Sequence, residues 1–149
     1  MSRWNSEFTC RLEAGAREAL AERAATESDV AAFYVPGAFE LPLAALTAAK
    51  TGSFDAIIAL GVVIRGDTPH FDYVAGQAAA GLMQASIESG IPVMFGVITA
   101  DTTEQVEARC GDKADNKGYE AALSAIEIAH TMRELREQGA RKKVLPHVV

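Results

Sequence analysis

Apolar positions follow two patterns along this chain, one typical of helices and one typical of buried strands. In 7–25 an apolar residue recurs every four positions, beginning at Phe8. This spacing predicts a helix with one buried face, capped by Asn5 or Ser6. Residues 56–64 are apolar almost throughout, which is the pattern of a parallel strand covered by helices on both faces.

The other elements are predicted in the same way, and most of them end at a Gly or a Pro. They are a strand over 30–35, a helix over 41–50, a helix over 71–89 closed by Gly90, a strand over 92–99, a short helix begun by Asp101 with Glu104 in a capping-box spacing, and a helix over 117–138 stopped by Gly139. Helices that alternate with strands predict an α/β fold, in which a parallel sheet lies in three α-β-α layers.

The predicted order begins with a helix, and three strands make a thin sheet for five helices. Flavodoxin-type domains begin with a strand that lies inside the sheet. We therefore expect the usual first strand to be missing ahead of Met1, through a truncated start. The alternative is that 144–149 folds back into that place, but Pro146 has no N–H to give to a central ladder.

Composition narrows the class of protein. Of 149 residues, 49% are apolar and 23% are charged, which suits a single globular domain over 1–149 with a tail from 139. A net charge of -6 with one short basic run, 141–143, disfavours nucleic acid as a partner. The sequence shows neither a secretory leader nor an apolar run of the ~20 residues that a membrane helix needs. Cys10 and Cys110 stand alone, so we expect a reducing compartment, the cytoplasm.

Candidate chemistry lies in the loops that follow the predicted strands, because ligands bind at the carboxyl ends of parallel strands. In the second loop Gly66 permits a turn, and Asp67 and Thr68 precede a helix whose free N–H groups suit a phosphate. His70 lies in the first turn of that helix. It is a proton carrier beside an anion site, or only a local cap or surface residue.

The remaining candidates each have a structural alternative. Trp4 stacks on a planar ring or is a core aromatic, and Glu40 binds a polar ligand or favours a helix N-terminus. Arg109 and Lys117 clamp a phosphate or are solvated charges, and Phe95 in an apolar strand is normally core. Motifs for nicotinamide cofactors, nucleoside triphosphates, zinc and serine-triad hydrolysis are absent.

Five blocks of the sequence resemble a known family when they are taken together. They are Ser-Arg-Trp-Asn at 2–5, Pro-Gly-Ala-Phe-Glu-Leu-Pro at 36–42, the long block 61–74 around His70, 92–99, and Asn-Lys-Gly-Tyr-Glu-Ala-Ala at 116–122. From 2 to about 135, the chain is similar to the lumazine synthases. The resemblance implies a transferase that joins 5-amino-6-(D-ribitylamino)uracil to 3,4-dihydroxy-2-butanone 4-phosphate. The product is 6,7-dimethyl-8-ribityllumazine, phosphate and water leave, and neither metal nor organic cofactor takes part.

The same resemblance implies a role for each matching position. His70 is the proton-transfer residue. The implied substrate-binding residues are Trp4 on the pyrimidine ring, Ala38, Phe39 and Glu40 along the ribityl chain and uracil, Val62, Val63 and Ile64 against the ring system, Asp67 and Thr68 at the phosphate, Phe95 lent by a neighbouring subunit, and Arg109 on the phosphate with Lys117 nearby.

The resemblance also implies partners. We expect a homo-oligomer, namely a pentamer, and riboflavin synthase as a further partner. The turn 111–116 has the uninserted length of members that build sixty-subunit shells, although Asp115 stands where they usually have Gly. Two alternatives to the enzyme stay open. One is a non-catalytic flavin- or lumazine-binding protein on the same fold, and the other is an inactive fragment without its first strand.

Overall fold

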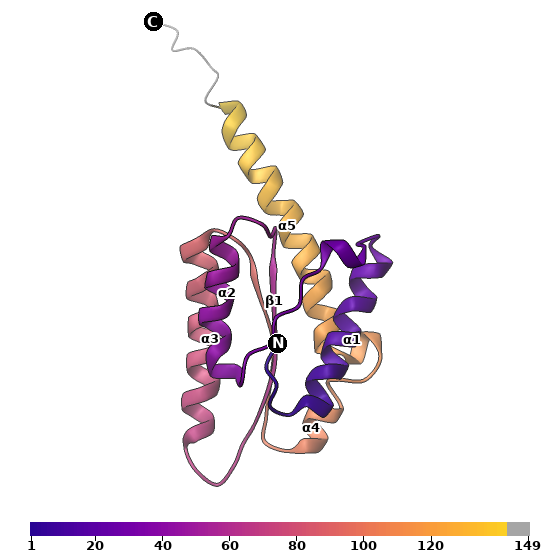
Figure 1. Ribbon diagram of the computed structural model, residues 1–149, viewed down its shortest axis with the longest axis vertical. Helices are drawn as coiled ribbons and strands as arrows, with labels where there is room; N and C mark the ends of the chain where they lie inside the picture. Colours follow the sequence, from indigo (N-terminus) through magenta and orange to yellow (C-terminus); the bar gives the residue numbers. More distant parts are fainter. Residues whose placement is uncertain (143–149) are drawn as a thin grey trace, which may run out of the picture.

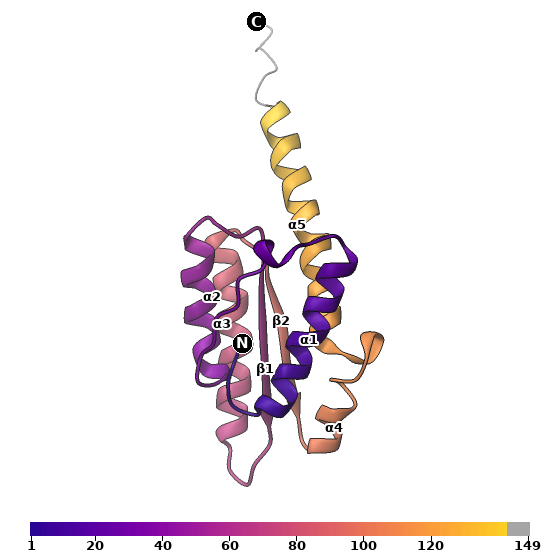
Figure 2. The same ribbon diagram turned by 45° about the vertical axis from the view of Figure 1, so that its right-hand side comes forward.

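The computed structural model describes residues 1–142, which form three layers around a two-stranded parallel sheet (Figures 1 and 2). Helices α2 and α3 cover one face, and α1, α4 and α5 cover the other. The elements are α1 (Ser6–Glu22), the 3₁₀ helices η1 (Glu27–Asp29) and η2 (Ala38–Glu40), α2 (Leu41–Lys50), β1 (Ile57–Ile64), α3 (His70–Ser89), β2 (Val93–Ala100), α4 (Thr103–Glu107), η3 (Lys113–Asp115) and α5 (Lys117–Lys142). The predicted α/β class, open and flavodoxin-like, is confirmed.

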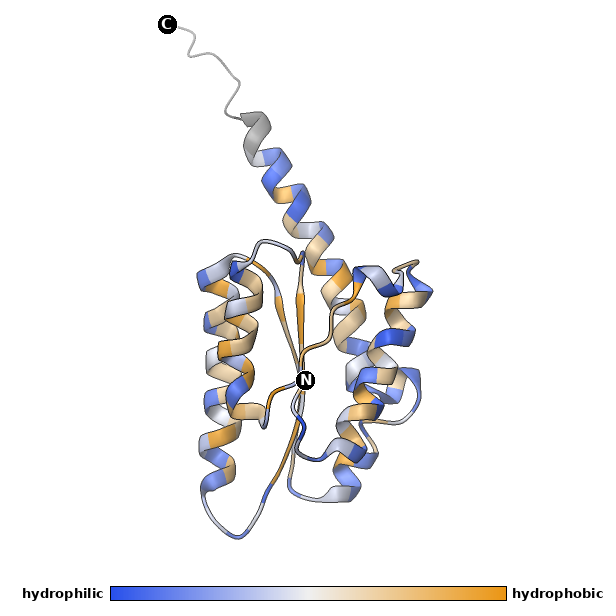
Figure 3. Ribbon diagram, in the orientation of Figure 1, coloured by the Kyte–Doolittle hydropathy of each residue, from blue (hydrophilic) through white to orange (hydrophobic). Residues whose placement is uncertain are grey.

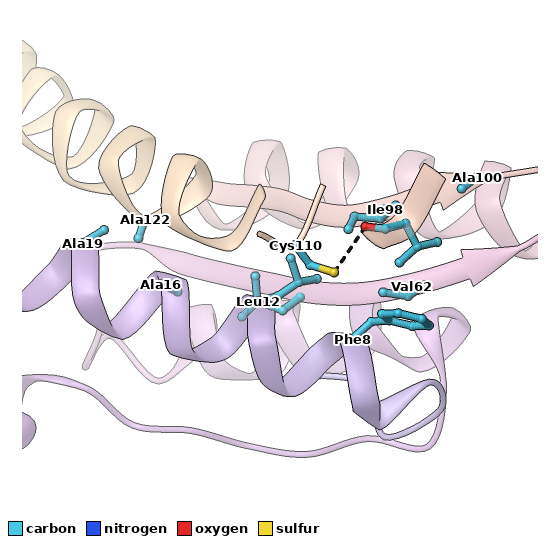
Figure 4. Packing of buried hydrophobic residues seen from close by; sticks show 11 residues of the cluster. Phe8, Leu12, Ala16, Ala19, Val62, Ile98, Ala100, Cys110 and Ala122 are labelled. Carbon is cyan, nitrogen blue, oxygen red and sulfur yellow. Dashed lines mark hydrogen bonds between the residues drawn. The ribbon is translucent and has the colours of Figure 1, made fainter. Parts of the chain in front are cut away.

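The two strands are apolar on both faces because helices bury both. They pair in parallel from Ile57 opposite Val93 to Ile64 opposite Ala100. Alternate side chains such as Leu60 and Val62 join Phe8 and Leu12 in one core cluster (Figure 4), while the others pack against α2 and α3. Coloured by hydropathy, both strands are mostly apolar and the polar segments lie on the outer helices (Figure 3).

The contact between α1 and α5 depends on two glycines and one buried amide. A Cβ on Gly118 would overlap the backbone carbonyl of Leu12, and a Cβ on Gly15 would lie 2.5 Å from Asn116. The Asn116 side chain donates to the carbonyls of Arg11 (3.0 Å) and Gly111 (2.9 Å), and it accepts from the N–H of Gly118 (2.9 Å). Because Gly118 has no side chain, its backbone approaches the Leu12 carbonyl directly, while the Asn116 amide fills the space beneath Gly15.

The predicted strand over 30–35 is wrong. Within the described residues this segment has one bridge, from Val35 to Ser2, and the sheet has two strands rather than three. Strand structure needs a continuous neighbour, and Met1–Arg3 supplies one only at its end. There the N–H of Ser2 donates to Leu60 (2.9 Å) and the N–H of Arg3 to Val35 (2.8 Å).

A cavity of about 380 Å³ lies along the first half of β1, next to Met1 and Val35. It is lined mainly by aliphatic side chains, among them Leu20, Val30, Ala45, Ile58 and Ala129. The cavity lies at the end of the sheet away from the strand carboxyl ends. The expectation of an earlier strand stays a prediction.

Several predicted helix boundaries need correction. Helix α1 ends at Glu22, because Ala24 adopts a left-handed conformation (φ 64°). Gly90 is left-handed (φ 69°) and closes α3 as predicted, whereas α5 runs past Gly139, which is not left-handed, to Lys142. Residues 143–149 of the predicted tail lie outside the described residues.

The short helix α4 begins differently from the prediction. Its cap is Thr102, whose hydroxyl accepts from the N–H of Gln105 (3.4 Å), and not Asp101. Asp101 instead donates its N–H to the Gln105 side chain (2.8 Å). Across residues 1–142, the helices fall short of the length and apolar character that a membrane crossing requires.

Candidate active site

The loops predicted to carry chemistry gather at the carboxyl ends of the two strands. The turn after β1, the start of α4 and the start of α1 lie at this end, the lower one in Figure 1. Residues 36–40 join them through Trp4, whose N–H donates to the Pro36 carbonyl (3.1 Å). One edge of the sheet therefore receives segments from four parts of the chain.

The first group of residues meets around Gly37, and we call it the ring end: Trp4, Gly37 and Glu40. The Trp4 ring lies so close to Gly37 that an added Cβ would come within 2.6 Å of two ring carbons. A carboxylate oxygen of Glu40 accepts from the N–H of Gly37 (2.8 Å). The Trp4 ring itself is 61% exposed, so its face is open to a planar ligand.

Asn5 attaches the ring end to the sheet, whereas its position in the sequence predicted only a helix cap. It does stand at the N-cap of α1, but its side chain makes no cap bond. Its side-chain amide instead donates to the carbonyl of Val62 (3.1 Å) at the end of β1. Asn5 is left-handed (φ 58°, ψ 44°), a conformation that Asn tolerates better than most residues, and that preference is the available sequence signal.

The predicted ring-binding residues differ in what they can present to a ligand. The side chain of Val62 is buried in the α1-facing core, so its backbone and not its side chain faces this edge. Val63 and Ile64 are half-buried at the end of β1, and Ala38 is buried at the start of η2. Phe39 is 54% exposed, so it offers more free apolar surface than these four residues.

The second group surrounds the start of α3, and we call it the anion end: Asp67, Thr68 and His70. All three side chains are exposed, and the N–H of His70 makes a long contact of 3.4 Å with the Thr68 hydroxyl. Pro69 occupies the N-cap without a side-chain cap bond. A helix of 20 residues thus begins at an exposed position without a side-chain cap on its N-cap residue, and its dipole favours an anion there.

Arg65 links the anion end to the end of β2, a role that no motif of the sequence predicted. Its guanidinium bonds the Asp101 carboxylate (2.7 Å), pairs with Asp72 (3.1 Å) and lies over the Phe71 ring, 4.1 Å from the centroid. The hydrogen bonds to Asp72 and then to Asp101 raise the pKa of Arg65 above its ordinary value. An arginine directly after β1 and an aspartate directly after β2 would have been the signal for this arrangement.

The two predicted phosphate cations lie next to each other, away from His70. The N–H of Lys117 donates to the Arg109 carbonyl (2.9 Å). The Arg109 guanidinium donates to the Gln105 carbonyl (2.8 Å), and the Lys117 ammonium pairs with Glu120. Among the described residues, no hydrogen bond or ion pair joins either cation to His70.

Phe95 is also remote from His70 within one chain. It lies opposite Ala59 in the middle of β2 and is 46% exposed. In the described part of the chain, no three His, Cys, Asp or Glu side chains gather as a metal site would require.

The fold and the residues at the strand carboxyl ends define the class of protein. It is a flavodoxin-like α/β protein with exposed aromatic, acidic and imidazole groups at those ends. The family model described as 6,7-dimethyl-8-ribityllumazine synthase matches residues 1–133. The chain therefore belongs to the lumazine synthase family, whose activity is that of a transferase in riboflavin biosynthesis.

Proposed function

We propose that this chain condenses 5-amino-6-(D-ribitylamino)uracil with 3,4-dihydroxy-2-butanone 4-phosphate to give 6,7-dimethyl-8-ribityllumazine. The observation that carries the proposal is His70, exposed on the uncapped start of α3, in a chain of this family. The ring end supplies the other requirement, an open Trp4 face beside the Glu40 carboxylate.

The reaction joins an amine to a ketone, eliminates inorganic phosphate and closes a ring. Trp4 and Phe39 offer surfaces for the pyrimidine, with Ala38, Glu40, Val62, Val63 and Ile64 along its edge. His70 moves protons between the reacting nitrogen, carbon and oxygen atoms, which contributes about 10²–10⁴ in rate. Holding both substrates in register contributes more, up to about 7–11 kcal/mol.

The phosphate binds at the start of α3, between Asp67, Thr68 and His70. Backbone N–H groups and the helix dipole supply attraction without a cation of that segment's own. Arg109, with Lys117 beside it, supplies the positive charge that stabilises the leaving phosphate. No metal or organic cofactor takes part in this scheme, so turnover should survive a metal chelator unchanged.

We further propose that the working form is a homo-oligomer, namely a pentamer. Within one chain no hydrogen bond or ion pair joins Arg109 or Lys117 to His70, and Phe95 lies in the half of β2 away from the strand carboxyl ends, so a neighbouring copy would supply these groups at each site. The outer faces of α2 and α3 support such an assembly through exposed Leu43, Tyr73, Met83 and Ile87. A sixty-subunit shell and binding to riboflavin synthase are extensions of this proposal, and we expect the assembly in the cytoplasm.

An assay of lumazine fluorescence from the two substrates tests the proposal directly. Product formation supports it. Tight lumazine binding without turnover would favour the binding-protein alternative, and a chain with neither property would favour the inactive fragment. Light scattering in the same preparation tests the assembly, and a stable monomer with full activity would contradict it.

A further inference from the structure

We propose that Arg65 is a positioning residue, which holds the start of α3, and with it His70, against the end of β2. This inference rests on the proposed function, because the group that it positions is the proposed proton carrier. Arg65 itself need not touch either substrate.

The contacts of Arg65 reach both elements at once. Two nitrogens of the guanidinium face the Asp72 carboxylate at 3.1 and 3.3 Å, and Nε donates to Asp101 at 2.7 Å. Phe71 lies beneath the same group. Because Phe71 and Asp72 directly follow His70, the three contacts fix the first turn of α3, which carries His70. A planar fork with several donors suits this bridge, and a lysine ammonium does not have that shape.

The loop on the other side of His70 gives little support. Gly66 has no neighbouring atom within 4 Å of a Cβ position, and residues 65–70 are all exposed. The backbone of Arg65 is itself anchored, since its N–H donates to the Ala100 carbonyl (2.9 Å). We call the contacts of Arg65 with Phe71, Asp72 and Asp101 the Arg65 clamp. It starts at a fixed point of the sheet, the Arg65 backbone, and ends on α3, across a loop that makes few contacts of its own.

Arg65 also changes the charge that a substrate phosphate meets. Asp72 and Asp101 are both more than half exposed at this edge, and unpaired carboxylates would repel an anion. Exposed ion pairs contribute little to global stability. Loss of Arg65 should therefore alter the kinetics while the melting temperature stays nearly unchanged.

The test replaces Arg65 by Met and compares it with Lys50→Met. Lys50 pairs with Glu88 near the opposite end of α3, with a similar exposure, so it controls for the loss of an exposed ion pair. For Arg65→Met we expect kcat to fall about tenfold through misplacement of His70. The KM for the uracil substrate should stay unchanged, and amide hydrogen exchange in 66–72 should become faster. Lys50→Met should match the wild type in all three measurements.

A wild-type kcat in Arg65→Met, or unchanged exchange in 66–72, would overturn the proposal. If that variant does not fold, Asp101→Asn removes one arm of the clamp and is judged by the same measurements. A wild-type chain that forms no lumazine would contradict the proposed function instead. The exchange measurement would then decide by itself whether Arg65 orders the start of α3.

Discussion

The ring end and the anion end of the candidate site are built differently. At the ring end, Trp4, Gly37 and Glu40 touch one another, and Asn5 bonds the same turn to the Val62 carbonyl. At the anion end, Asp67, Thr68 and His70 are exposed and share one long contact. The ring end is organised by contacts among its own side chains, whereas the anion end depends on the start of α3 and on the Arg65 clamp.

This difference separates the two tasks that the proposed reaction sets. A planar ring is recognised by a surface already in place, since Trp4 rests on Gly37 before any ligand arrives. A phosphate is recognised by N–H groups that need only be unpaired. The ring end should therefore be sensitive to side-chain volume, and the anion end to charge and to the position of α3.

The largest effect should come from disrupting the packing of α1 on α5, because this packing stabilises the fold that carries both ends. In Gly118→Ala the new Cβ would overlap the Leu12 carbonyl, so the two helices must separate. We expect a loss of about 3 kcal/mol in the free energy of unfolding, measured by urea denaturation, with both ends impaired. Gly76→Ala is the matched control, because its Cβ meets nothing within 4 Å and it should be neutral or stabilising. Equal stabilities for the two variants would contradict the prediction.

The second largest effect should impair the anion end and leave the ring end unchanged. His70→Ala should lower kcat about a hundredfold, because general acid–base transfer is lost, while the KM for the uracil substrate changes little. Steady-state kinetics with both substrates measure this. An unchanged kcat would remove the proton-transfer role of His70.

Arg109→Ala should act on the phosphate alone. We expect the KM for the butanone phosphate to rise about tenfold, since a hydrogen bond to a charged group is worth roughly 1.5–3 kcal/mol. Arg23→Ala, at the exposed C-terminal end of α1, controls for the loss of a surface charge. A rise in the KM of the uracil substrate instead would show that Arg109 is assigned to the wrong end.

The smallest effect should come from volume at the ring end. In Gly37→Ala the added Cβ displaces the Trp4 ring, which is exposed and can move at little cost to stability. The KM for the uracil substrate should rise about fivefold, the scale of a weakened aromatic contact. The KM for the phosphate substrate should stay the same, and equal rises in both values would argue that the two ends are not separate.

Local patterns were sufficient for most elements and for part of the site. The apolar run that became β1, the helix of α3 with His70 in its first turn and the left-handed Gly90 at its end depend on neighbours in the chain, so spacing alone predicts them. The helix end that suits a phosphate follows from the same local information.

Tertiary structure decided the features that need partners far along the chain. The 30–35 segment has strand composition, yet only its last residues lie beside a neighbour, Met1–Arg3, and a strand exists only where a neighbour continues. Gly139 was predicted to end a helix, but glycine permits the left-handed conformation without requiring it.

The site shows the same division. The sequence by itself determined which residue types stand after each strand, including His70 and the acidic residues around it. Only the folded chain decided that Asn5 bonds Val62, that Trp4 rests on Gly37, and that Arg65 reaches Asp101. These pairs are 33 to 57 residues apart, and their contacts depend on the order in which the elements are arranged in the folded chain. Periodicity carries no information about that order, because it records only which face of an element is buried.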